Sequence, residues 1–209
     1  MKCHWHFKHY ITFDEYGNGL VSFDGTMRNT YRLTTIGGVK YMMLTLDFFP
    51  TDDAVNWAAE AIEAHPDYNV ILTTHAYYKT GMIIGDGELQ QDEDLYNVPD
   101  ISVANSGQDL YDKLVSRYSN IVLVMCGHAS TEDYGPAYEI SERADGSKVV
   151  QMMINHQQLE SVDGRSYGML AMLYFKNDGK TVSLEYFSTA NEMYYMDKFQ
   201  YEFQLDLID

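Results

Sequence analysis

Two short hydrophobic runs, the nearly continuous 69–74 and the continuous 121–126, constrain the fold of this 209-residue chain more than any other feature. Each follows a segment in which apolar residues recur at helical spacing. An uninterrupted apolar strand of this length is typical of a strand that is buried on both faces. The middle of the chain therefore predicts helix, strand, long loop, helix and strand, with both strands inside a sheet.

The segments around these runs carry clear start and stop signals. A helix is predicted to begin at Thr51 or Asp52, which can cap it, and to end before Pro66. Ahead of it, residues 30–50 predict a hairpin that turns at Gly37-Gly38, because glycine accepts the positive φ angles of a tight turn. The second helix, 107–120, leads directly into the second apolar strand.

The rest of the chain predicts strands. Turns are expected at Asp145-Gly146 and at 177–179, and the final segment 195–207 alternates as a half-exposed strand does. The loop 79–107 is rich in glycine and aspartate, and loops of this length are commonly functional. With no repeat and no proline-rich linker, residues 1–209 are expected to form a single α/β domain with a β-rich second half.

A histidine closes each apolar strand, His75 after the first and His128 after the second. Ligands gather where strands of an open α/β sheet end, and a neutral imidazole there can bind a metal ion. The alternative is a buried histidine that makes two ordinary hydrogen bonds. If both residues bind one ion, we expect their rings to lie within about 3–5 Å of each other.

Charge and cysteine content exclude some functions. Fourteen lysines and arginines against 31 aspartates and glutamates give a net charge of −17, which disfavours nucleic-acid binding. A phosphate site in such a chain needs a local positive charge, for which a metal ion is the obvious source. No run approaches the roughly 20 apolar residues of a membrane span, and the first ten lack a signal peptide's apolar core. Cys3 and Cys126 are too few for a disulfide framework, and Cys126 is expected in the core.

Three stretches together resemble the C-terminal half of the calcineurin-like metallophosphoesterases: HPDYNVILTTHAYY, GQDLYDKLVSRYSNIVLVMCGH and GMLAMLYFKNDGKTVSLEYFST. The resemblance runs from about Tyr31 to the end and is closest to a bacterial branch whose members are often secreted or surface-attached. It implies the C-terminal part of an α/β/β/α sandwich, a phosphoester substrate and a secreted or cell-surface location. It also implies that His75 and His128 bind one ion of a two-metal centre of Mn, Fe or Zn.

Two departures from the family pattern shape these expectations. Gly127-His128-Ala129-Ser130 has Ser130 where the family has a second histidine, and a hydroxyl is a poorer ligand for such metals. We therefore expect at most one ion in this chain. The family's earlier motifs, Asp-X-His, Gly-Asp-X-X-Asp and Gly-Asn-His, are absent from residues 1–50. The chain is accordingly expected to be a C-terminal piece of a longer enzyme, inactive alone, with an uncovered sheet surface through which it could self-associate.

Further positions could bear on chemistry. Tyr77 and Tyr78 are expected at the rim of the site, and His65 is expected to be structural. The remaining candidates are side chains of metal-ligand type: His4, His6, His9, Asp86, Asp92, Glu93, Asp94 and His156. Of these, His156 ends a third apolar strand and is the runner-up ligand. The acidic loop is expected to be a solvated surface, and the N-terminal histidines are expected at a frayed or partner-packing edge. The alternative function is a non-catalytic, β-rich binding or structural module derived from the same fold.

Overall fold

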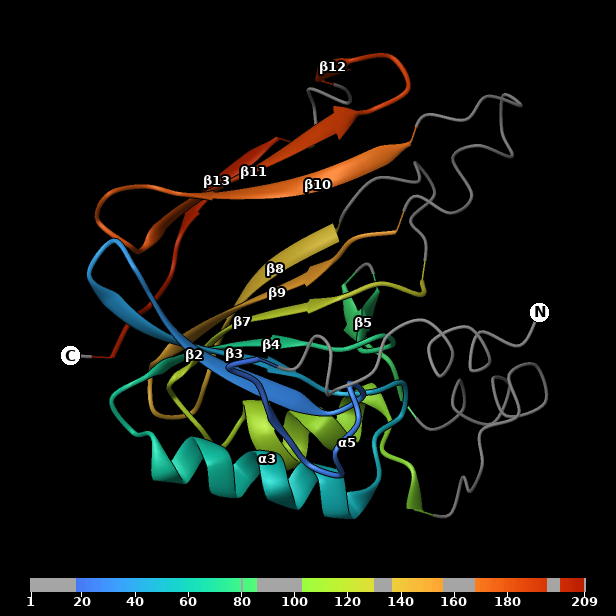
Figure 1. Ribbon diagram of the computed structural model, residues 1–209, viewed down its shortest axis with the longest axis vertical. Helices are drawn as coiled ribbons and strands as arrows, with labels where there is room; N and C mark the ends of the chain where they lie inside the picture. The colour runs from blue at the N-terminus through green and yellow to red at the C-terminus, as the bar shows by residue number, and fades with distance from the viewer. Residues whose placement is uncertain are drawn as a thin grey trace.

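The computed structural model describes residues 18–79, 81–85, 103–129, 137–155, 168–194 and 200–208. These residues form three layers: two helical segments, a seven-stranded mixed sheet and a four-stranded antiparallel sheet (Figure 1). We call the two sheets the main sheet and the second sheet. The predicted α/β class, with a mixed sheet, two helices and a β-rich second half, is confirmed.

The main sheet contains both helix-linked strands at its centre. Its four inner strands, β3, β4, β7 and β9, are parallel, and the outer strands are antiparallel to their neighbours. In order across the sheet the strands are β1 (Val21–Ser22), β2 (Thr30–Ile36), β3 (Val39–Thr45), β4 (Asn69–Thr73), β7 (Ile121–Cys126), β9 (Lys148–Met153) and β8 (Ala137–Glu142).

Both apolar strands are buried on two faces, as predicted. In β4, Val70 and Leu72 pack toward the helices, whereas Ile71 packs toward the second sheet. In β7 a bulge opposite Val70 and Ile71 places Val122 and Leu123 consecutively in the core between the sheets. The bulge changes the phase of β7, so simple alternation from Ile121 does not predict which face its later residues occupy.

The first helix forms with the predicted ends. Helix α3 (Asp52–Ala64) has Thr51 as its N-cap, whose hydroxyl accepts a hydrogen bond from the Ala54 amide, and His65 as its C-cap. The buried residues lie on one face against the main sheet and include Val55, Ala58 and Ile62. His65 is structural as expected, because its Nδ1 lies 2.8 Å from the Ala61 carbonyl oxygen.

The second helix is shorter than predicted. It begins at the capping box of Ser106 and Asp109, continues as α5 (Gly107–Leu110), and passes into a π-helical turn, η2 (Tyr111–Val115). The Arg143 guanidinium donates a hydrogen bond to the Val115 carbonyl at 2.6 Å and another to the Ile121 carbonyl. The buried Arg143 guanidinium binds the Val115 carbonyl oxygen, which in a longer helix would accept a backbone hydrogen bond. The helix therefore ends here, and the chain turns into β7.

The second sheet covers the other face of the main sheet. It consists of β10 (Met169–Phe175), β11 (Thr181–Ser188), β12 (Met193–Tyr194) and β13 (Tyr201–Gln204), with β10 on one side of β11 and β12 and β13 on the other. The predicted turns between β8 and β9 and between β10 and β11 are confirmed. A small hairpin of β5 (Tyr78–Lys79) and β6 (Met82–Ile83) lies in the predicted long loop. No helix in the described ranges is long and apolar enough to cross a membrane.

Candidate functional site

His75 and His128 meet where β4 and β7 end. The Nε2 atom of His75 lies 3.1 Å from the Nδ1 atom of His128, and the ring centroids are 5.0 Å apart. The two strands are parallel neighbours, so their carboxyl ends open at the same edge of the main sheet. The predicted proximity of the two rings is confirmed; metal binding by them stays a prediction.

Backbone hydrogen bonds extend the pairing of β4 and β7 beyond the strands and hold both histidines in place. The Thr74 amide donates to the Met125 carbonyl at 3.0 Å, and the Gly127 amide donates to the His75 carbonyl at 2.9 Å. His128 itself has a φ of +62°, which is uncommon outside glycine. Its carbonyl accepts a hydrogen bond of 2.8 Å from the Asn155 side chain. A strained residue held by its surroundings is a common feature of functional sites.

Among the described residues, Phe48 adds a third ring to the cluster, and the sequence did not single it out. Its centroid lies 4.7 Å from that of His75 and 5.4 Å from that of His128. It comes from the β3–α3 connection, where the buried Phe49 also has a positive φ of 48°. The available signal was its position: β3 is the parallel neighbour of β4, so residues just after β3 reach the same sheet edge.

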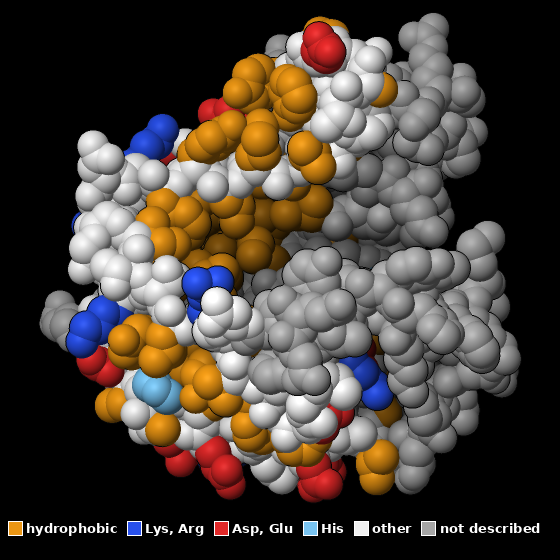
Figure 2. Space-filling view, viewed as in Figure 1, with side chains coloured by type: hydrophobic (Ala, Val, Ile, Leu, Met, Phe, Trp, Pro, Cys, Tyr) orange, Lys and Arg blue, Asp and Glu red, His pale blue; other side chains and the backbone are white. Residues whose placement is uncertain are grey.

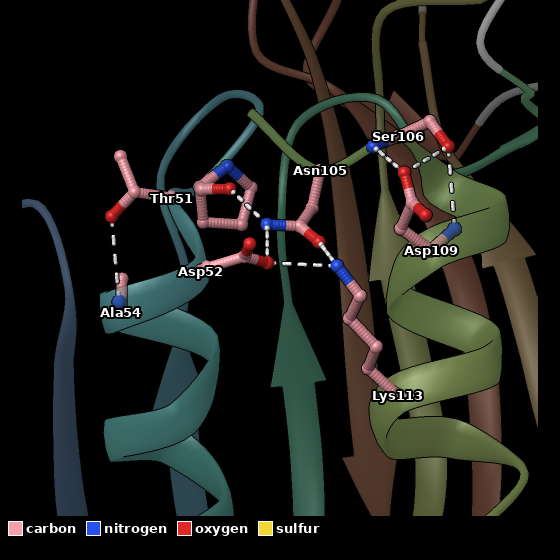
Figure 3. A network of polar contacts seen from close by, with 8 residues as sticks. Thr51, Asp52, Ala54, Asn105, Ser106, Asp109 and Lys113 are labelled. Atoms are coloured by element: carbon pink, nitrogen blue, oxygen red, sulfur yellow. Dashed lines mark hydrogen bonds and ion pairs between the residues drawn. The ribbon is translucent and has the colours of Figure 1, made fainter. Parts of the chain in front are cut away.

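Side-chain hydrogen bonds at the starts of the two helices fix this connection (Figure 3). The buried Asn105 side chain donates to the Pro50 carbonyl at 2.9 Å and to the Asp52 carboxylate at 3.2 Å. The Lys113 ammonium donates to the Asn105 side-chain oxygen at 2.5 Å and to Asp52 at 2.7 Å. Because Pro50 follows the two phenylalanines directly, this network limits the positions open to Phe48.

Tyr77 and Tyr78 do not form the rim, and that prediction is wrong. Both are buried in the core beneath the main sheet, at 0% and 3% exposure. The Tyr77 hydroxyl donates to the Gln151 side chain, and the Tyr78 hydroxyl accepts from the Gly81 amide. After His75 the chain turns inward, because burying the two large aromatic rings lowers the free energy of the folded chain relative to leaving them in water.

Asp47 and Cys126 also lie near the strand ends, and each has hydrogen-bond partners of its own. The Asp47 carboxylate, just after β3, accepts a hydrogen bond of 2.6 Å from the Arg28 guanidinium, while the Asp47 carbonyl accepts one from the Thr74 hydroxyl. Cys126 is buried as expected, and burial raises the pKa of its thiol to about 11. Its sulfur is hydrogen-bonded to the Tyr78 backbone within the core.

The contact between the two histidines is a ring-to-ring hydrogen bond, and its length is also compatible with two ligands of one metal ion. Two nitrogens bound to one ion at about 2.1 Å are separated by about 3.0–3.4 Å for octahedral or tetrahedral angles, and the observed separation is 3.1 Å. Within the described ranges, no group of three or more His, Cys, Asp or Glu side chains could hold a metal ion. Several predicted candidates lie outside those ranges: His4, His6, His9, Asp86, Asp92, Glu93, Asp94, Ser130 and His156.

Comparison with known proteins gives one weak similarity. No family model matches the chain. A Bacillus subtilis (strain 168) protein named "Uncharacterized protein YvnB" is 24% identical over 158 residues. The matched region covers 75% of this chain but 11% of that protein. The chain therefore spans about a tenth of the length of the relative that it matches.

Proposed function

We propose that this chain is part of a divalent-metal-dependent phosphoesterase that hydrolyses phosphate mono- or diesters. The observation that carries the proposal is the 3.1 Å approach of His75 Nε2 to His128 Nδ1 at the ends of adjacent parallel strands. The resemblance of the surrounding sequence segments to the calcineurin-like metallophosphoesterases also favours the proposal, and it implies the C-terminal part of that family's α/β/β/α sandwich.

In this proposal each residue has a defined task. Neutral His75 and His128 hold one Mn, Fe or Zn ion, and the hydrogen bonds from Gly127 and Asn155 keep the two rings convergent. Phe48 packs an apolar ring against both imidazoles and supports their orientation. When bound, a divalent ion supplies positive charge for the phosphate and lowers the pKa of a coordinated water.

The chain's negative charge narrows the range of expected substrates. A net charge of −17 repels polyanions, so a small phosphoester or a cell-surface phosphoester suits the protein better than a polynucleotide. Two histidines cannot complete a two-metal centre, and the bridging acidic ligands are assigned to a preceding segment that carries the missing motifs. The 209 residues alone are accordingly expected to bind metal without turning over substrate.

Zinc titration by calorimetry tests the site directly. The chain is expected to bind zinc at least about tenfold more tightly than the His75→Ala/His128→Ala double variant. Replacing even the groups that hydrogen-bond to metal ligands lowers metal affinity about 10–100-fold. His65→Ala is the matched control, because His65 caps α3 and packs on Tyr31 and Tyr68. Equal zinc binding by the chain and the double variant would favour the non-catalytic binding or structural module instead.

Measuring substrate hydrolysis distinguishes metal binding from catalysis. The chain alone is expected to hydrolyse p-nitrophenyl phosphate no faster than buffer with the same Mn²⁺ or Zn²⁺. A longer protein that includes Asp-X-His, Gly-Asp-X-X-Asp and Gly-Asn-His motifs is expected to turn it over and to lose that activity with His128→Ala. Activity of the longer protein that survives His128→Ala would contradict the proposal.

A further inference from the structure

Strand β10 forms an open edge of the second sheet. It pairs with β11 on one side, and no strand in the described ranges pairs with its other side. The Thr189 amide donates to Gly168 and the Lys176 amide donates to Thr181, so the even-numbered residues of β10 are bonded to β11. The backbone amides and carbonyls of Met169, Ala171, Leu173 and Phe175 therefore face the open edge.

This edge lacks the features that usually prevent strands from associating. Protein sheets protect their edges with very short strands, charged residues, proline or bulges. In the main sheet, edge strand β1 has two residues, and edge strand β8 carries Glu139 and Glu142. Strand β10 has seven residues, MLAMLYF, with no charge and no proline, and its pairing with β11 is regular throughout.

Both faces of β10 are apolar. On the outer face, Leu170 and Tyr174 are 48% and 40% exposed. On the inner face, the odd-numbered residues are only partly buried at the margin of the core between the sheets. Figure 2 shows apolar side chains lining a hollow between the second sheet and the main sheet. A further strand beside β10 would cover this margin.

We propose that β10 pairs with β10 of a second copy of this chain, antiparallel and about a twofold axis at Met172. This register places Ala171 opposite Leu173 and Leu170 opposite Tyr174, and it joins the edge-facing amides and carbonyls of the odd-numbered residues in hydrogen bonds. The contact is self-complementary, as a twofold interface requires. The inner side chains of each copy extend the partner's inter-sheet core.

The uncharged, self-complementary β10 edge allows a second copy to be the occupant despite the chain's net negative charge. Two chains of net charge −17 repel each other, so they can associate only where the contact itself carries no negative charge. Residues 169–175 meet that condition, whereas the β8 edge brings glutamates from both copies together. Salt screens the remaining repulsion and is expected to strengthen the dimer. The inference is independent of the metal site and of the proposed activity.

Sedimentation velocity over a concentration series, at low salt and at about 0.15 M salt, tests the proposal. Ala171→Pro removes an amide that faces the open edge and leaves the β10–β11 bonds in place, so it is expected to weaken the dimer about tenfold or more. Ile140→Pro is the matched control: the Arg143 amide donates to Ser147, so even-numbered residues of β8 face the other open edge. This control is expected to dimerise like the parent chain.

A second variant guards against misfolding of Ala171→Pro. Tyr174→Glu changes an exposed side chain on the outer face of β10 and places a carboxylate opposite the apolar Leu170 of the second copy, so it is expected to sediment as a monomer. Circular dichroism checks that this variant is folded. The parent chain sedimenting as a monomer at every concentration and salt would overturn the proposal. So would a dimer that persists in Tyr174→Glu, or one that Ile140→Pro abolishes.

Discussion

Cys126 shows how environment decides the role of a residue next to the site. It lies two positions before His128, yet its side chain packs into the core beneath the main sheet. Its sulfur accepts a hydrogen bond from the Tyr78 amide and donates one to the Tyr78 carbonyl. Burial disfavours the thiolate and raises the pKa of Cys126 to about 11. The folded protein therefore holds this proton at a pH at which the unfolded chain releases it.

This linkage predicts a loss of stability in mild alkali. An unfolded thiol ionises near pH 8.5, so the free energy of unfolding is expected to fall by roughly 1 kcal/mol between pH 7.5 and 9.5 through Cys126 alone. The stabilising contribution is complete below the unfolded pKa and is lost as the pH rises toward the folded value. Urea unfolding at both pH values measures it, with Cys126→Ala as the control that should lack this share of the pH dependence.

At the scale of elements, the contacts between the starts of α3 and α5 hold together segments far apart in sequence. An isolated bridge pairs Thr51 with Ala104, and the Asn105 amide donates to the Pro50 carbonyl at 2.9 Å. Asn105 is 1% exposed, whereas the side chains of Lys113 and Asp52 are 42% and 58% exposed. Hydrogen bonds from Lys113 and then Asn105 lower the pKa of Asp52, but water screens that exposed ion pair.

The difference in burial predicts unequal effects of mutation. Asn105→Ala leaves the buried Pro50 carbonyl with one donor fewer and is expected to cost about 1–3 kcal/mol of unfolding free energy. Lys113→Ala breaks an exposed ion pair and also removes the donor to the buried Asn105 side-chain oxygen, so it is expected to cost about 1 kcal/mol, less than Asn105→Ala. Lys40→Ala, which breaks the exposed Lys40–Asp67 pair, is the control for a surface ion pair. Chemical denaturation ranks the three, and a larger cost for Lys113→Ala than for Asn105→Ala would contradict this account.

Across the whole molecule, two hairpin turns join the two sheets. The β2–β3 turn meets the β10–β11 turn so closely that a Cβ added at Gly37 would lie 2.7 Å from the Gly179 nitrogen. Tyr41, buried in the main sheet, donates a hydrogen bond of 2.6 Å to the Gly179 carbonyl. Gly179 has a φ of +71°, and a Cβ there would lie 2.6 Å from the Val39 side chain. This junction sets where the second sheet lies on the main sheet.

Replacing the glycine at this junction is expected to destabilise the fold. Gly179→Ala combines a left-handed backbone with a steric clash and is expected to cost about 2–5 kcal/mol of unfolding free energy. Gly146→Ala is the matched control, because Gly146 also has a positive φ of 85° in a hairpin turn but nothing lies within 4 Å of its added Cβ. The control is expected to cost about 1–2 kcal/mol. Thermal or chemical unfolding compares the two, and equal costs would contradict a close junction.

The elements of this fold were predictable because their signals are local. Apolar runs, the Thr51 cap, the Gly37-Gly38 turn and the later hairpin turns each depend on a few neighbouring residues. The shortened second helix was not predictable, because it depends on Arg143, which lies 28 residues from the Val115 carbonyl that it binds. The burial of Tyr77 and Tyr78 was missed for the same reason: it depends on packing partners in other segments.

By itself, the sequence determined that a histidine closes each of two buried strands, because strand length and apolar content are properties of short segments. Only the tertiary structure decided that these strands are parallel neighbours and that His75 and His128 approach to 3.1 Å. It also decided that Phe48, not the neighbouring tyrosines, packs against the imidazoles. Contacts between distant segments depend on sheet order and register, which arise from the packing of the whole chain rather than from any one segment.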